Sequence, residues 1–513
     1  MREPHGSARR RRGTVWRNDK EQLDVETSIQ SNADRRSADS MSAQANRAQP
    51  TNDARESLAG IAPIHLVRLL EHPRAIPSIY AFFIILMTIF AIPPLVNDWL
   101  GLLNKDYDLW YWTGWFYGRG AAIYPTEKYR LFPFMYPPSC AVMLATANRL
   151  GRTGFMLALI LINSIAWIAS VRLSIAATGL RKPAAIALAT LVPVLCVVPF
   201  IHDTYLLGQP NLLLLALMLA AAAWLRRGRE FKAGILVGIA AAIKAFPIMA
   251  VGYLLYRRKW KASAAVGATL VFLLLIAPLA YRTPRQTIDD LSLWTRGMVL
   301  KYDSGTIAQR PERCYSFKNQ SLIALEHRLL RRVPADGETD PFWRVNLVNL
   351  DFNGVNAAIL LSATMLGLFS LRAMPIFRSP VDRRPAAAEW GMTLMLILMF
   401  SPLSFNYFFV WLLYPLTYAL ASAIKAPVGS RDRTIWKIAF GVAVGLMTLS
   451  IAIPKIAQAY GNVLFATIIL FATTGFDLIS KRRPVREFRS QESTETEANA
   501  TNANDVQIAK ASL

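Results

Sequence analysis

The stretch "AIPSIYAFFIILMTIFAIPPLV", residues 75–96, is a long apolar run that contains no charged residue. A helix of about 20 apolar residues is long enough to cross the hydrocarbon core of a bilayer. Runs of similar length recur along the chain, and 53% of its 513 residues are hydrophobic. Soluble proteins are usually about 45–50% apolar. The pattern therefore predicts an all-α polytopic membrane protein.

The apolar runs predict about twelve membrane segments, of which ten to twelve span the bilayer fully. The expected segments are 75–96, 133–148, 154–177, 183–201, 209–225, 233–256, 262–281, 353–372, 388–403, 405–424, 435–454 and 459–480.

Basic connectors predict the orientation of these segments. The net charge is +23, and much of the excess lies in short connectors such as 371–385, 425–437 and 481–486. Loops rich in Lys and Arg stay in the cytoplasm, which explains the charge without a nucleic-acid partner. We expect a multi-pass protein of the cell (inner) membrane with both termini cytoplasmic. The long connectors 97–132 and 282–351 are then extracytoplasmic.

The ends of the chain differ in composition from its middle. Residues 1–60 and 484–513 are polar and poor in aliphatic side chains, so they cannot bury enough apolar surface to fold. We expect disordered cytoplasmic tails on both sides of one membrane-embedded domain, residues 61–483.

Segment 233–256 does not fit a simple crossing. Basic connectors flank it on both sides, "RRGREFK" (226–232) and "YRRKWK" (256–261), and it contains Lys244 and Pro247. Either the positive-inside rule fails once here, or the segment is a broken or re-entrant pair. A lysine at membrane depth costs about 2.5–3.5 kcal/mol on insertion scales. Lys244 either snorkels toward an interface or has a buried anionic partner, and its distance from both segment ends favours the partner.

The first long connector holds two acids among aromatic residues, "NKDYDLWYWTGWFYGRGAAIYP" (104–125). Trp and Tyr favour the membrane interface, so we expect a short helix along the outer surface. Asp106 and Asp108 lie two residues apart, and a helix points such side chains to different sides. At most one of them faces an inward cleft. The alternative is an interfacial anchor with two solvated acids.

Further polar residues stand at the ends of apolar runs. They include Tyr136 in "MYPP" (135–138), Gln209 and Asn211 in "HDTYLLGQPN" (202–211), Lys318, Asn319, Gln320 and Arg328 in "SFKNQSLIALEHRLLRR" (316–332), and Tyr407 in "FSPLSFNYFFVW" (400–411). Helix capping is the alternative explanation for Asn211. The sequence has no Walker loop, no dinucleotide fingerprint and no Cys/His metal set, so we expect no cofactor and no metal.

These motifs together resemble glycosyltransferase family 87, a polyprenol-dependent group of the GT-C class. The resemblance covers roughly residues 75–425. It rests on Asp106-Tyr107-x-x-Trp110 with Gly120 and Tyr124-Pro125, Tyr136-Pro137-Pro138, Gly208-Gln209-x-Asn211, Gly234, Gly238, Lys244 and Pro247, Asn319-Gln320-Ser321-Leu322 with Arg328, and Ser401-Pro402-x-Ser404. The family often has a tryptophan and histidines after the last motif, where this chain has Phe405, Asn406, Tyr407 and Phe408.

The resemblance implies a GT-C-like fold and a polyprenyl-monophosphate sugar as donor, as in the mannosyltransferases of phosphatidylinositol mannoside synthesis. Mannose or another hexose would pass, with inversion, to a hydroxyl of an extracytoplasmic glycolipid or glycan. Asp106 matches the acid of the family's first loop and is the expected general base, with Asp108 in reserve. A cation would stabilise the leaving phosphate as its charge develops. An aromatic ring would stack on the acceptor sugar. The cations are Lys244, Arg296, Lys318 and Arg328, and the rings are Trp110 and Trp112.

Two other classes remain open. A flippase or transporter for a lipid-linked sugar would fit a lysine in a broken helix, and an envelope polysaccharide polymerase or ligase would share the membrane layout. A transferase needs an acid fixed near the donor phosphate at the outer surface. A transporter needs polar groups near the bilayer midplane instead.

Overall fold

The structure is a computed structural model, and it describes residues 58, 60–124, 134–300, 302–303, 306–307, 314–337, 339–375 and 383–481. All helices and strands named below belong to one compact unit that begins at Gly60. The two tails expected at 1–60 and 484–513 lie outside the described residues, apart from Leu58 and Gly60 themselves.

The protein is all-α, and its described residues include eight helical stretches that are long and apolar enough to cross a membrane. They are α3 (Ala75–Trp99), α5 and α6 (Pro138–Ala147 and Gly151–Thr178, counted as one), α7 (Pro183–Leu207), α11 (Trp260–Val271) with its extension to Ala280, α15 (Phe352–Ala373), α17 (Leu413–Lys425) with the 3-10 helix Asn406–Leu412, α18 (Arg431–Ala452) and α20 (Asn462–Ser480). The chain is therefore a multi-pass membrane protein by helix length and composition.

The expected number of segments is confirmed only in part. Three further apolar helices are shorter, namely α8 (Asn211–Arg226), the stretch Phe246–Tyr256, and Ala386–Phe400 within α16 (Arg383–Phe400). The expected segment 133–148 is also short, because α5 begins only at Pro138 and ends at Ala147. Among the described residues, eight stretches therefore have the length of a full span, and the expected ten to twelve are confirmed to that extent only.

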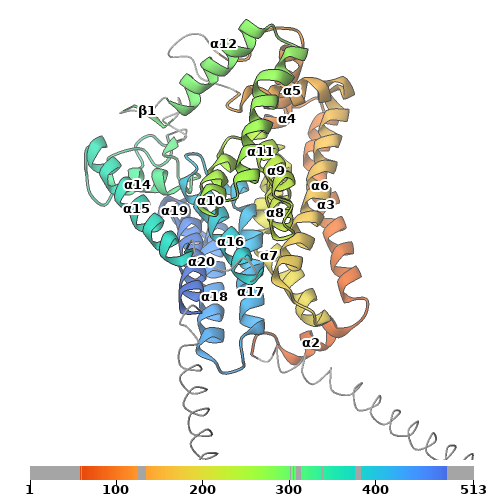
Figure 1. Ribbon diagram of the computed structural model, residues 1–513, viewed down its shortest axis with the longest axis vertical. Helices are drawn as coiled ribbons and strands as arrows, with labels where there is room; N and C mark the ends of the chain where they lie inside the picture. The colour runs from red at the N-terminus through yellow and green to blue at the C-terminus, as the bar shows by residue number, and fades with distance from the viewer. Residues whose placement is uncertain are drawn as a thin grey trace, which may run out of the picture. The chain divides into compact units, whose positions relative to one another are not determined.

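The centre of the bundle is formed by the stretch Asn406–Lys425, of which 83% of the spanning window is buried. It packs against α6, α7 and α18. By contrast, only 11% of the window is buried in Phe352–Ala373, which lies along the side of the bundle in Figure 1. The stretch Asn406–Lys425 is therefore a central helix. The helix Phe352–Ala373 presents its apolar side chains outward, as a lipid-facing helix does.

The segment expected at 233–256 is a hairpin of two helices. α9 (Glu230–Ile243) ends at Lys244, whose backbone is extended, and α10 (Ala250–Tyr256) follows a 3-10 turn at Phe246–Met249. Lys259, just after α10, pairs with Glu230 at the start of α9, with 2.9 Å between Nζ and Oε1. Both basic connectors therefore lie at the same end of the bundle, which agrees with the broken or re-entrant alternative.

Two glycines allow α9 to lie directly against α11. A Cβ on Gly234 would stand 2.1 Å from the Ala262 carbonyl oxygen, and one on Gly238 would stand 2.6 Å from Thr269 Cβ. Small residues four apart permit such close approach of helix backbones in a membrane. The contact fixes the position of α9 along α11. It therefore also fixes how far from the connectors Lys244 ends the helix.

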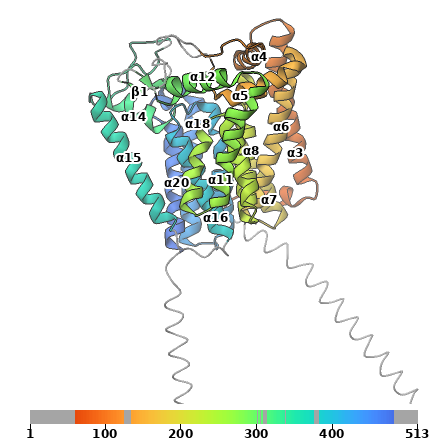
Figure 2. The same cartoon turned by 45° about the horizontal axis from the view of Figure 1, so that its top comes forward.

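One end of the bundle, here named the loop face, is covered by shorter elements (Figures 1 and 2). These are α4 (Lys105–Gly118), α12 (Pro284–Trp294), α14 (Leu322–Leu330), α19 (Pro454–Ala459) and the antiparallel pair β1 (Tyr302–Asp303) and β2 (Thr306–Ile307), in which Tyr302 faces Ile307. They belong mostly to the long connectors 97–132 and 282–351. The helix expected in the first connector is confirmed as α4.

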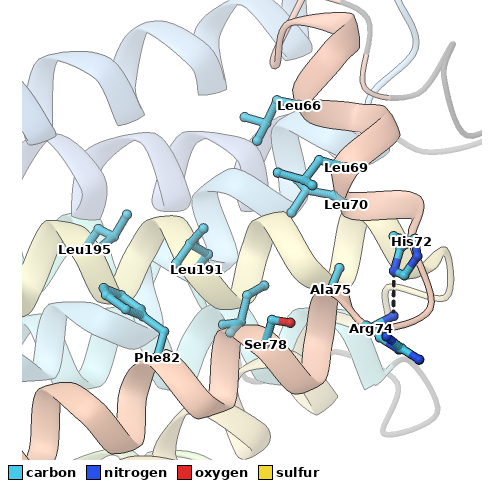
Figure 3. A pocket seen from close by; sticks show the side chains of 11 residues that line it. Leu66, Leu69, Leu70, His72, Arg74, Ala75, Ser78, Phe82, Leu191 and Leu195 are labelled. Carbon is cyan, nitrogen blue, oxygen red and sulfur yellow. Dashed lines mark hydrogen bonds between the residues drawn. The ribbon is translucent and has the colours of Figure 1, made fainter.

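The other end, here named the basic end, carries the short connectors. Arg226 and Lys425 donate to the carbonyls of Ala177 and Thr178 at the C-terminus of α6, a favourable position for cations. The amphipathic α2 (Ile64–Glu71) also lies here, beside α3 and α7. Figure 3 shows the groove between them, which has a volume of about 440 Å³ and is lined by leucines of α2 and α7 and by Phe82.

The hairpin predicts that both connectors are accessible from one side of the membrane. In a protein whose Cys140, Cys196 and Cys314 are replaced by serine, Arg229→Cys and Lys261→Cys should react with an impermeant thiol reagent from the same side. Arg119→Cys on the loop face serves as the control and should react from the opposite side. Labelling of Arg229→Cys and Lys261→Cys from opposite sides would mean that residues 233–256 cross the membrane fully.

Candidate active site

The side-chain amide of Gln209 stands at the centre of a polar cluster beneath the loop face. Its Nε2 donates to Oδ2 of Asp106. Its Oε1 accepts from Lys244 Nζ and from the Tyr136 hydroxyl, both at 3.1 Å. One amide therefore joins a carboxylate from α4 to an ammonium group from the end of α9. The name "Gln209 cluster" is used below for Asp106, Tyr136, Gln209, Asn211, Lys244 and Tyr407.

The backbone turn after α7 places Gln209 in this position. α7 ends at Leu207, and Gly208 adopts φ +73°, a conformation that side chains disfavour. A Cβ on Gly208 would also stand 2.7 Å from ring carbons of Tyr107. Asn163 then holds the Gln209 carbonyl through a 3.0 Å hydrogen bond. Only glycine fits this turn, which brings the amide of Gln209 beneath α4.

Lys244 lies where α9 breaks, surrounded by oxygens and aromatic rings. Besides Gln209, its Nζ donates to Asn211 Oδ1 at 3.4 Å. Its amine lies 4.2 Å from the ring centre of Phe408 and 5.2 Å from that of Tyr407. Cation–π contacts of this kind favour a desolvated ammonium. The amine is thus held inside the cluster and does not snorkel toward either end.

Asn211 and Tyr407 are fixed by the backbone around them. The Asn211 side chain donates to the Tyr407 carbonyl at 3.2 Å, and Trp411 donates to the Asn211 carbonyl at 3.0 Å. Asn211 is also the first residue of α8, so it lies at the positive end of a helix dipole. These bonds join the start of α8 to the 3-10 helix that carries Tyr407.

Asp106 is half-buried in the first turn of α4. Lys105, directly before it, has φ +43° and is one of two non-glycine residues with positive φ among the described residues. The helix is anchored by Tyr107, whose hydroxyl donates to the Tyr205 carbonyl at 2.7 Å. Trp110, one turn further, packs on Tyr136 with ring centres 4.7 Å apart. α4 therefore presents its acid and an aromatic ring to the same cluster.

Comparison with known protein families matches residues 134–402, more than half of the chain, to Glycosyltransferase family 87. The chain belongs to glycosyltransferase family 87. No curated protein and no solved structure matches it.

The match includes Tyr136, Gln209, Asn211 and Lys244 of the Gln209 cluster. It ends short of Tyr407 and begins after α4, so the acid of this glycosyltransferase's first loop lies outside the matched residues. Pro125, a further part of the resemblance seen in the sequence, lies outside the described residues.

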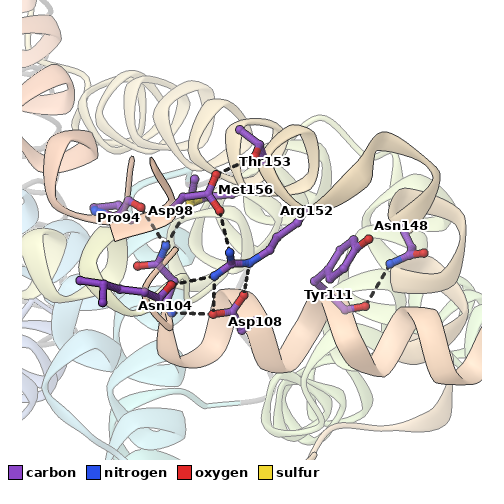
Figure 4. Close-up of polar contacts among 10 residues, drawn as sticks. Pro94, Asp98, Asn104, Asp108, Tyr111, Asn148, Arg152, Thr153 and Met156 are labelled. Carbon is purple, nitrogen blue, oxygen red and sulfur yellow. Dashed lines mark hydrogen bonds and ion pairs between the residues drawn. The ribbon is translucent and has the colours of Figure 1, made fainter. Parts of the chain in front are cut away.

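Asp108 faces away from the cluster, as helical spacing predicts. Its oxygens accept from Arg152 Nε at 2.6 Å, from Arg152 Nη2 at 3.0 Å and from the Asn104 backbone N–H at 2.6 Å. Figure 4 shows Arg152 between Asp108 and Asp98. Burial raises the pKa of Asp108, but the bonds from Arg152 and Asn104 outweigh it and hold the pKa below its ordinary value. Asp108 thus connects the start of α4 to Arg152 at the N-terminus of α6. Arg152 in turn pairs with Asp98 at the C-terminus of α3.

Asn319 and Gln320 bind backbone groups at the loop face. Asn319 donates to the Pro402 carbonyl and accepts from the Ser404 N–H, at 2.8 and 2.9 Å. Gln320 donates to the Gln458 carbonyl at 2.6 Å. The two amides join the segment before α14 to the turn after α16 and to α19. None of these hydrogen bonds reaches the Gln209 cluster.

Arg328 is fully buried, and its hydrogen bonds within the described residues all go to backbone carbonyls. Its guanidinium donates to the carbonyls of Asn319, Ser316 and Ala459 at 2.7, 2.8 and 3.1 Å, and to two more at longer distances. Burial lowers the pKa of Arg328 to about 9, so the side chain stays charged at neutral pH. Lys318 and Arg296, the other expected cations of this glycosyltransferase, are exposed.

The structure also reveals residues that the sequence did not single out. Arg152 pairs with Asp108, and Phe408 and Phe246 surround Lys244. Arg152 is a charged residue at the start of an apolar run, and this position could have indicated that it pairs with an acid of the preceding connector. Nothing in the sequence distinguished the two phenylalanines from ordinary core residues. Among the described residues, no group of three His, Cys, Asp or Glu side chains is arranged to hold a metal ion.

The ion pair of Asp108 predicts a pH-dependent contribution to stability. A lowered pKa in the folded state stabilises the protein above the ordinary aspartate pKa of about 3.9, and this contribution is lost as the pH falls. Asp108→Asn should therefore lower the melting temperature by a few degrees at pH 7. The difference from wild type should close as the pH falls below about 4.

The measurement is thermal unfolding of purified protein, followed by intrinsic tryptophan fluorescence. Asp289→Asn is the matched control, because Asp289 is exposed and its loss should leave the melting temperature unchanged. A difference between wild type and Asp108→Asn that is the same at pH 7 and at pH 2 would contradict the assignment.

Proposed function

We propose that this family 87 glycosyltransferase moves a hexose, such as mannose, from a polyprenyl-monophosphate donor to a hydroxyl of an extracytoplasmic glycolipid or glycan. The observation that supports it most is the Gln209 cluster. There, a half-buried carboxylate and a half-buried amine bind the two ends of one amide, just beneath the loop face. Attack by an acceptor hydroxyl on the donor sugar requires a base and a stabilised leaving phosphate.

Asp106 is the proposed general base. Its carboxylate is oriented by the Gln209 N–H and lies in the first turn of a helix that covers the end of the bundle. A polar acceptor arriving at the loop face meets this acid before it meets the rest of the cluster. Direct displacement at the sugar carbon then inverts the anomeric centre, and the acceptor proton passes to the carboxylate.

Lys244 is the proposed partner of the donor phosphate. Its amine is bound by neutral amide oxygens and ring faces, so a phosphate oxygen can replace weak contacts with a charge-assisted one. The N-terminus of α8 at Asn211 adds the positive end of a helix dipole. Both groups are fixed before the donor arrives, as efficient stabilisation of developing charge requires. Tyr136 and Trp110 offer aromatic faces to the sugar.

A groove between α7 and α18 supports a lipid-linked substrate. It has a volume of about 490 Å³ and is lined by apolar side chains such as Leu195, Met447 and Ile451. Asp203, Asn406 and Gln458 line it near the loop face. The side-chain oxygen of Asn406 is buried with no hydrogen-bond partner among the described residues. Asn406 adjoins Tyr407, so an isoprenoid tail in the groove would bring its phosphate end next to the cluster.

The proposed topology follows from the hairpin. We infer that the eight long helical stretches together with α8 and α16 make ten crossings, and that α9 and α10 enter and leave at the basic end. The basic end then faces the cytoplasm. The loop face, with the Gln209 cluster, is extracytoplasmic, and both termini are cytoplasmic in the inner membrane.

The direct test supplies purified protein with labelled polyprenyl-phosphate sugars and a membrane-lipid extract, and looks for a labelled glycolipid or glycan. Transfer from a mannosyl or other hexosyl donor supports the proposal. Movement of the labelled donor across a vesicle membrane without any transfer would support a flippase instead.

Asp106→Asn should express and insert normally, retain donor binding and lose at least about 100-fold in transfer rate, because a positioned general base contributes about 10²–10⁴-fold. Asp108→Asn is the paired control, measured per folded molecule. It should lose much less, since Asp108 binds Arg152 outside the cluster. Reversed effects would make Asp108 the base, and near-full transfer in both variants would remove α4 from the chemistry.

Lys244→Met keeps the length of the side chain but removes its charge, so it should fold and lose donor affinity. Removing one partner of a buried charged pair costs about 3–5 kcal/mol, which corresponds to at least about 100-fold weaker binding. The measurement is equilibrium binding of a fluorescent polyprenyl-phosphate sugar. Donor affinity equal to that of wild type would exclude Lys244 from the phosphate site.

A further inference from the structure

The two basic connectors meet in a cavity at the base of the hairpin, far along α9 from Lys244. The cavity has a volume of about 570 Å³ and is lined by residues 228–232 from one connector and by Arg258, Trp260 and Lys261 from the other. The name "connector cluster" is used here for Arg229, Lys232, Arg258 and Lys261. The four side chains come together only because α9 and α10 enter and leave at the same end.

The connector cluster has an unbalanced positive charge. All four side chains are exposed. Glu230 is the one acid that lines the cavity, and it is paired with Lys259. Within the described part of the chain, no carboxylate pairs with Arg229, Arg258 or Lys261, and Lys232 lies 5.9 Å from the ring of Trp224. The cavity therefore suits an anionic group.

Arg258 occupies a strained backbone position in this cavity. The turns that follow α8 and α10 have the same pattern of hydrogen bonds, in which Arg229 N–H bonds to Trp224 and Lys259 N–H bonds to Leu254, at 2.9 and 2.8 Å. Gly228 occupies the left-handed position of the first turn with φ +73°, and Arg258 occupies that of the second with φ +54°. Left-handed backbone at a non-glycine residue is strained, and such strain is found most often at ligand-binding and active sites.

Two exposed aromatic side chains lie beside the cations. Phe231 is 60% exposed and Trp260 is 62% exposed, and both line the cavity. Large aromatic rings next to Lys and Arg are typical of the bilayer interface, where the rings enter the acyl region and the cations remain at the level of the head groups. A freely soluble anion would leave these rings in water.

We propose that the connector cluster binds the phosphate head group of an anionic phospholipid in the leaflet at the basic end. Basic pockets between membrane helices on the cytoplasmic side bind such head groups. The cations contact the phosphate, and Phe231 and Trp260 pack against the first part of the acyl chains. The bound lipid joins the two ends of the hairpin whose tip carries Lys244.

The test measures binding of a fluorescent phosphatidylglycerol to the purified full chain in detergent, with phosphatidylcholine as the uncharged comparison. Each Lys or Arg near a phosphate contributes about fivefold in affinity. Arg258→Gln/Lys261→Gln should therefore bind phosphatidylglycerol at least about tenfold more weakly than wild type. Arg431→Gln/Lys437→Gln removes two exposed charges from the start of α18, outside the cavity, and should change the affinity less than about twofold.

A second variant separates folding from binding. Arg258→Gly removes the guanidinium and relieves the left-handed backbone, so it should melt no lower than wild type and still bind about fivefold more weakly. Unchanged affinity in Arg258→Gly overturns the proposal. So does an equal loss in the control pair, which would show only general attraction of the basic end.

Two further outcomes would also overturn it. Equal affinity for phosphatidylcholine would mean that the cavity does not recognise the head-group charge. Displacement of the lipid by inorganic phosphate at low millimolar concentration would indicate a site for a soluble anion. Because the readout is lipid binding, a failure here leaves the proposed transferase function untouched, and a failure of that function leaves this result interpretable.

Discussion

The amide of Gln209 is the constraint on which the rest of the site depends. A carboxamide has one donating end and one accepting end, so it can hold a carboxylate and an ammonium group at the same time but only in one orientation. Lys244 and Tyr136 bind the oxygen, which leaves the N–H group for Asp106. The acid and the amine are thereby kept close without neutralising each other directly.

The sequence predicted the class of fold and the place where it is interrupted. Uncharged runs such as 75–96 indicated a helical membrane protein. The two basic connectors around Lys244 left two alternatives, an exception to the positive-inside rule or a broken segment, and the hairpin agrees with the second. The spacing of Asp106 and Asp108 predicted that their side chains point apart, and they do. In each case a local rule, such as helix period, charge placement or the cost of burying a charge, was sufficient.

Partners distant in the chain could not be predicted in this way. Arg152 pairs with Asp108 across 44 residues, and the five carbonyls around Arg328 come from two separate segments. Arg328 was expected near a leaving phosphate because its motif, Asn319-Gln320-Ser321-Leu322 with Arg328, resembles one of glycosyltransferase family 87. Its donors bind the chain's own backbone in a buried position, so it closes the loop face over the bundle. Whether a cation builds the fold or binds a ligand is decided by which acceptors surround it, and composition alone does not show this.

The re-entrant hairpin connects the topology to the chemistry. A full crossing at 233–256 would place one strongly basic connector on the wrong side, against the positive-inside rule. Ending α9 at Lys244 avoids this and leaves the C-terminus of the helix at membrane depth.

A helix C-terminus stabilises a nearby cation by about 0.3–1 kcal/mol, and by more in a partly buried position. Before a donor binds, the amide oxygens of Gln209 and Asn211 and the rings of Tyr407 and Phe408 surround the lysine amine. In the proposed reaction the donor phosphate takes over this role, and the N-terminus of α8 at Asn211 faces the same phosphate with the opposite helix pole. The C-terminus of α9 therefore favours the charged lysine, and the N-terminus of α8 favours the phosphate that pairs with it.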